Sequence, residues 1–212
     1  MKNAGSSWFK RAAAVAVLAS MALPALSDEM PIAVRLYMNF QHEPAAHVLE
    51  TMKAELQSIM APAGIALEWR SLNRNEIDAA SSLLAVMHFS GSCEPGAVQQ
   101  ASPPGGALGL THVVDGRIVP FSNVDCDKVW NVLVRGIVCL PGRKWEAAFG
   151  RALARVSAHE LYHILARTAR HSSSGLARPW FTEIELLSDK LRFGEKDCNA
   201  LRAGSAKQLG GR

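Results

Sequence analysis

The sequence contains no C-x-x-C pair, no internal repeat and, after residue 27, no apolar run long enough to cross a membrane. The missing C-x-x-C spacing argues against a cysteine zinc site and against a thioredoxin-type redox motif. Four widely separated cysteines are present instead, and an even number in an exported protein favours disulfides. We expect Cys93 to pair with Cys126, because both flank segments of strand character; free buried thiols are the alternative. The pairing of Cys139 and Cys198 stays open.

The first 27 residues differ in kind from the rest of the chain. Residues 1–11 carry three positive charges and no acid, and residues 12–26 form an apolar run that ends in small residues. This order predicts a secretory signal peptide over residues 1–27. We therefore expect an exported protein, periplasmic or secreted, without stable membrane insertion after signal cleavage. Removal of the signal lowers the formal net charge from +4 to +1. The charge therefore gives no reason to expect a nucleic-acid partner.

The N-terminal half of the remaining chain predicts a sheet that carries helices. Residues 31–38 and 65–72 have strand composition, and the apolar positions between them recur every four residues, as in an amphipathic helix. This strand–helix–strand unit implies a parallel pair. Residues 82–92 are mostly apolar and predict a central strand. Residues 107–124 predict a hairpin about Asp115-Gly116, with Pro120 placing the second arm at an edge or a strand end.

Helical periodicity begins at about Lys144. Residues 144–168 predict one long helix, and residues 180–193 a second helix with Thr182 as its N-cap. The last ten residues have no apolar face. The expected organisation is a signal peptide (1–27), a single domain (28–202) and a flexible tail (203–212).

The predicted long helix contains the stretch HELYH, from His159 to His163. Histidines four apart lie on one helix face, so both imidazoles can reach one metal ion about 2.1 Å from each nitrogen. Glu160 is turned by about 100° from His159, and it can lie beside the metal and take a proton from a zinc-activated water. The spacing therefore indicates a zinc-and-base unit, although helices also carry such histidines by chance.

The motif resembles that of the zincin metallopeptidases. Residues 156–181 also resemble small exported bacterial proteins of that superfamily with HExxH, seven residues, then His-Ser. The resemblance implies His159, His163 and His171 as zinc ligands and Glu160 as the catalytic base. It further implies a single-domain α/β (α+β) zincin-like fold, with a mixed twisted sheet and the long helix carrying the motif. The implied activity is zinc-dependent hydrolysis of a peptide or protein substrate. The alternative is a catalytically inactive zincin-fold protein that binds metal or acts as an adaptor in the cell envelope.

The third ligand has a second candidate. A helix continuing past His163 would carry His171 about 12 Å along its axis, so the chain must leave the helix within residues 166–170, where no Gly or Pro helps. In the zincins with a glutamate ligand, an ExxxD arrangement follows on a later helix, and Glu185 with Asp189 fits that pattern. The resemblance favours His171, and both remain candidates. Ala177 stands where the related proteins have Met, so a supporting methionine turn is doubtful.

The remaining candidates concern single residues. Tyr162 points away from the ligand face and is expected in the core, and His88 on a sheet face. His112, in the strand before the long helix, is a candidate for lining a cleft beside the metal, where zincins pair an edge strand with an extended substrate. Substrate preference and oligomeric state stay open.

Overall fold

The computed structural model describes residues 30–71, 83–94, 106–137, 140–141 and 143–210. The expected signal peptide (1–27) and Cys139 lie outside these residues. Among the helices that the described ranges contain, none is long and apolar enough to cross a membrane.

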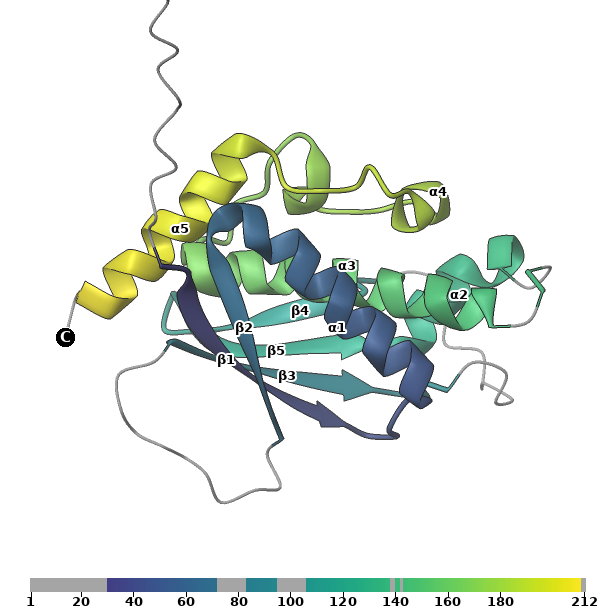
Figure 1. The fold of residues 1–212 in the computed structure, drawn as a ribbon. Helices are drawn as coiled ribbons and strands as arrows, with labels where there is room; N and C mark the ends of the chain where they lie inside the picture. Colours follow the sequence, from purple (N-terminus) through teal and green to yellow (C-terminus); the bar gives the residue numbers. More distant parts are fainter. Residues whose placement is uncertain (1–29, 72–82, 95–105, 138–139, 142, 211–212) are drawn as a thin grey trace, which may run out of the picture.

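The structure is mixed α/β, with five strands in one sheet (Figure 1). The strands follow the order β2-β1-β3-β5-β4, and β4 alone runs antiparallel to its neighbour. The expected parallel pair and the central position of the third strand are both confirmed. Their bounds are β1 (Ile32–Phe40), β2 (Ile65–Ser71), β3 (Leu83–Ser90), β4 (Gly109–Val114) and β5 (Arg117–Asp125).

The hairpin between β4 and β5 forms where the sequence predicts it. Asp115 and Gly116 both have positive φ, 50° and 71°, as a two-residue turn between twisted strands requires. The expectation for Pro120 was wrong, because β5 is an interior strand. Pro120 is tolerated there because the pairing with β4 shifts between Thr111 and Val113, and the pairing with β3 begins only at Phe121. A residue without an N–H therefore costs no ladder hydrogen bond.

The major helices cover one face of the sheet (Figure 1). In α1, Val48, Met52 and Leu56 recur every four residues and are fully buried. Helix α3 is buried along most of its length, so it forms the centre of the core between the sheet and the other helices. The helix bounds are α1 (Ala46–Met60), α2 (Cys126–Ile137), α3 (Lys144–Ala166), α4 (Glu183–Leu187) and α5 (Glu195–Gly210), with 3-10 turns at Ala61–Ala63 and Gly175–Ala177.

Three helical features differ from expectation. Helix α2 was not predicted, although buried Val129, Leu133 and Ile137 recur every four residues. The helix expected over residues 180–193 ends at Leu187; Thr182 does cap it, with a capping box to Glu185. The expected tail is helical as far as Gly210. Local periodicity alone does not decide these segments, because contacts with the rest of the chain override it.

The disulfide expected between Cys93 and Cys126 is present. It joins the chain just after β3 to the first residue of α2, and the Asp127 carboxylate accepts a hydrogen bond from the Ser92 N–H beside it, at 3.0 Å. Cys198 is buried and free. The disulfide thus ties the start of α2 to the end of β3.

Candidate metal centre

The long helix ends before it can carry His171 away from the other two histidines. Arg167 closes α3 with a left-handed conformation, φ 51°, and its N–H bonds to the His163 carbonyl. The Thr168 N–H bonds to the same carbonyl at 3.2 Å. The chain therefore leaves the helix within residues 166–170, as expected, and it does so without Gly or Pro.

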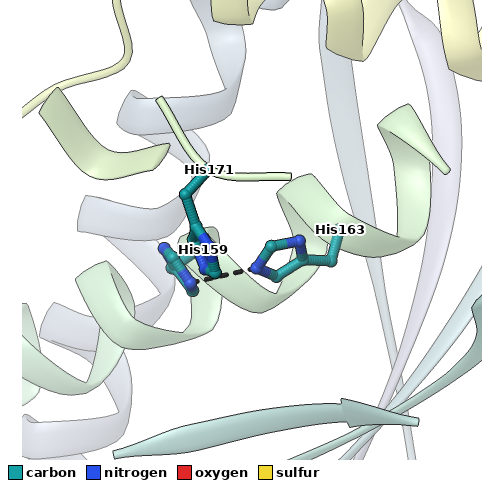
Figure 2. Close-up of side chains that lie close together, drawn as sticks. All are labelled: His159, His163 and His171. Atoms are coloured by element: carbon teal, nitrogen blue, oxygen red, sulfur yellow. Dashed lines mark hydrogen bonds between the residues drawn. The ribbon is translucent and has the colours of Figure 1, made fainter. Parts of the chain in front are cut away.

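The reversal brings three imidazoles together (Figure 2). One ring nitrogen from each of His159, His163 and His171 can be chosen so that all three lie within 4.8 Å of one another. His159 and His163 are buried on α3, each 7 % exposed, and their Nε2 atoms are 3.1 Å apart. His171 comes from the following loop, is exposed, and stacks on His159 with ring centroids 5.2 Å apart.

The hydrogen bonds of the two helical histidines fix which nitrogen is free. Nδ1 of His159 donates to the Leu176 carbonyl at 2.8 Å, and Nδ1 of His163 donates to the Thr168 carbonyl at 2.7 Å. A carbonyl only accepts, so each Nδ1 carries the proton and each Nε2 presents a lone pair. This is the arrangement in which histidines bind metals, with the second nitrogen held by an outer partner.

Two facing lone pairs can both bind one cation placed between them. Burial lowers the pKa of His159 to about 4 and also lowers the pKa of His163, so neither ring supplies a second proton at neutral pH. Tetrahedral zinc with bonds of about 2.1 Å places two ligand nitrogens about 3.4 Å apart, close to the observed 3.1 Å. The donor set of three imidazoles fits a divalent cation.

Glu160 lies beside the histidines and is buried, at 3 % exposure. The Thr111 hydroxyl on β4 donates to Glu160 Oε2 at 2.6 Å. Burial raises the pKa of Glu160 to about 7, and the Thr111 hydrogen bond acts in the opposite direction. A Cβ at Gly109, also on β4, would come within 2.9 Å of the Glu160 side-chain carbon Cδ. Strand β4 therefore packs directly against Glu160.

A cavity of about 170 Å³ opens in front of His159 and Glu160. Its apolar walls come from four parts of the chain: the segment before β4, helix α2, helix α3, and the segment that leads from the 3-10 turn at Gly175–Ala177 into α4. The Phe181 ring meets the His159 ring edge-on, with centroids 5.5 Å apart. The apolar side chains that line the cavity are Ala107, Leu108, Val132, Val156, Pro179, Trp180 and Phe181.

The competing third ligand, Glu185, is engaged elsewhere. Its carboxylate caps α4 and pairs with Arg178 at 2.6 Å. The Thr182 N–H and Arg178 lower the pKa of Glu185 to about 2. Asp189 is 88 % exposed and lies 3.6 Å from Arg155. Within the described residues, the only group of three or more His, Cys, Asp or Glu with metal-binding spacing is the histidine trio.

Two of the other sequence candidates, His112 and His88, lie away from the candidate metal centre. His112 is not at the site: its Nε2 lies 3.4 Å from the Asn123 side-chain oxygen, and it lines a separate cavity with His88. Strand alternation explains this, because Thr111 points to Glu160 and its neighbour must point to the opposite face. Tyr162 is buried, as expected. The roles of Thr111 and Gly109 were not predicted from the sequence. The one available signal was the alternation of side chains along this strand, which places Thr111 on the opposite face from His112.

No family model matches the chain, and no curated protein sequence matches it.

Proposed function

We propose that the protein is a zinc-dependent peptidase of zincin type that hydrolyses peptide bonds outside the cytoplasm. The observation that carries the proposal is the convergence of three imidazoles around one point, with a buried carboxylate next to them and a cavity in front. His159, His163 and His171 would hold the ion. Bound zinc would supply a Lewis acid that polarises a carbonyl and acidifies water.

Glu160 is assigned to proton transfer. Its pKa of about 7 lets the carboxylate accept a proton from an attacking water near neutral pH and then release it to the leaving amine nitrogen. Thr111 holds Oε2 of this carboxylate, so Oε1 is the oxygen left for the transfer. A base whose pKa lies close to the working pH performs both steps efficiently.

Strand β4 supports a peptide as the substrate. It is an edge strand, and Leu110, Val113 and Val114 are each more than half exposed. An extended chain can add to such an edge through main-chain hydrogen bonds. Because β4 also contacts Glu160, a peptide on this edge would pass the candidate base, and the apolar cavity would receive one of its side chains.

Two further features support a site of action outside the cytoplasm. The disulfide between Cys93 and Cys126 is typical of oxidising compartments. The N-terminal 27 residues have the charge and hydropathy order of a signal peptide.

The test combines metal analysis with hydrolysis. Purified protein is expected to contain one zinc per chain by mass spectrometry of the metal and to cleave a fluorogenic peptide mixture with apolar residues. Glu160→Gln should keep the zinc and lower kcat by at least about 10²-fold, because the base is lost while the ligands remain. Chain that binds no zinc would refute the proposal. Zinc binding without any hydrolysis would leave the inactive metal-binding or adaptor protein as the better reading.

A further inference from the structure

The third histidine differs from the other two in how its ring is held. His159 and His163 each have a hydrogen bond from Nδ1 to a carbonyl oxygen. Among the residues that the structure describes, no hydrogen bond reaches the His171 ring, and this side chain is exposed. It lies in a stretch without regular structure between Arg167 and the 3-10 turn at Gly175–Ala177. Apart from its ring contacts with His159 and His163, the position of the His171 side chain is therefore set through its backbone.

The next residue provides that support. The Ser172 hydroxyl donates to Asp197 Oδ1 at 2.5 Å, and its backbone N–H donates to the Ala177 carbonyl at 2.8 Å. The side chain of Ser172 is thus held by α5, and its backbone by the 3-10 turn at Gly175–Ala177.

Asp197 is placed to anchor this loop firmly. It is a carboxylate with 4 % exposure, in the first turn of the 16-residue helix α5, where the helix dipole favours a negative charge. Among the described residues it forms no ion pair, so the Ser172 hydroxyl is the side-chain donor that compensates its burial. Such a charge-assisted hydrogen bond is shorter and stronger than one between neutral groups.

We propose that Ser172 and Asp197 are positioning residues that hold His171 in the metal centre. Asp197 on α5, 26 residues beyond His171, thereby supports the third histidine of a set whose other two members lie on α3. The inference rests on the proposed metal centre and not on peptidase activity. A chain that binds metal without hydrolysing peptides would need the same support of His171 by Ser172 and Asp197.

The experiment measures zinc affinity of the full chain by competition with a chromophoric chelator, at a temperature where circular dichroism shows every variant folded. Ser172→Ala is expected to weaken zinc binding by about 10- to 100-fold, the usual effect of removing an outer-shell partner. Ser172→Thr keeps the hydroxyl and should restore most of the affinity. Ser205→Ala is the matched control, because Ser205 is a fully buried serine on α5 whose hydroxyl has no hydrogen-bond partner.

A double-mutant cycle separates positioning from general destabilisation. If Ser172 acts through His171, then Ser172→Ala added to His171→Ala should change the zinc Kd by less than about twofold. The cobalt-substituted Ser172→Ala protein should also show the visible spectrum of the His171→Ala variant in part of its population. Wild-type affinity in Ser172→Ala, or an equal loss with and without His171, would overturn the inference. Failure of the wild-type chain to bind zinc would instead overturn the metal centre itself.

Discussion

Glu55→Ala should lower the free energy of unfolding far more than the same substitution at an exposed carboxylate. Glu55 on α1 is 10 % exposed and accepts hydrogen bonds from two arginines. Its Oε1 lies 2.9 Å from Nη2 of Arg155 on α3 and 2.9 Å from Nη1 of Arg192. Arg155 is fully buried, and burial lowers its pKa while Glu55 acts against that effect. Glu55→Ala would therefore leave the buried Arg155 with only the exposed carboxylate of Asp189, 3.6 Å away, as a counter-charge.

The expected loss follows from the burial. Removing one partner of a buried ion pair costs about 3–5 kcal/mol, because the remaining charge stays desolvated. The control is Glu68→Ala: Glu68 pairs with Arg35 and Arg70 on the sheet but is 41 % exposed, so its loss should cost less than about 1 kcal/mol. Urea unfolding followed by circular dichroism, with a constant slope, measures both free energies. Equal losses for the two variants would show that the Glu55 cluster is no more important than a surface pair.

Two other predictions concern the site. Zinc should raise the thermal stability of the protein, and a chelator should remove the gain. Free zinc at 100 times Kd stabilises the native state by about 2.7 kcal/mol, which calorimetry would detect. His171→Ala should gain less stability than the wild-type chain at the same zinc concentration. Thr111→Val should leave zinc affinity unchanged but move the acidic limb of the kcat/KM profile to higher pH. The reason is that the Thr111 hydrogen bond lowers the pKa of Glu160, so its loss raises that pKa and the ionised base appears only at higher pH. Thr111→Ser keeps the hydroxyl and should keep the profile; an unshifted limb in Thr111→Val would count against Glu160 as the base.

Local sequence rules predicted the parts of the fold that depend on neighbouring residues. The hairpin follows from the Asp115-Gly116 turn, and α3 from apolar residues at helical spacing. The pair His159 and His163 needs only the geometry of one helix turn. The disulfide between Cys93 and Cys126 was inferred from the strands beside it. Except for the disulfide, which joins residues 33 positions apart, each of these predictions concerns a contact within one element or between consecutive elements.

The errors concern segments whose structure is decided from a distance. The residues after Leu187 have helical periodicity but form a turn at residues 189–190 and otherwise have no regular structure as far as residue 194. Arg155 and Glu55 supply the reason. Arg155 binds the Leu186 carbonyl, and Glu55 binds Arg192, so both ends of this segment are fixed to α1 and α3. Pro120 was misjudged for a similar reason, because the shift in β4 pairing that accommodates it involves residues of another strand.

The same distinction applies within the candidate metal centre, where the histidines depend on increasingly remote parts of the chain. His163 is held by the Thr168 carbonyl, five residues away, and His159 by the Leu176 carbonyl, 17 residues away. The Leu176 N–H in turn bonds to the Arg192 carbonyl, and Arg192 is fixed by Glu55. A single HELYH motif therefore specifies where two imidazoles lie along a helix, but not which tautomer they adopt or what completes the set. In this chain those properties come from residues 168–197, so a protein that kept the motif and lost this segment would keep two histidines and lose the metal centre.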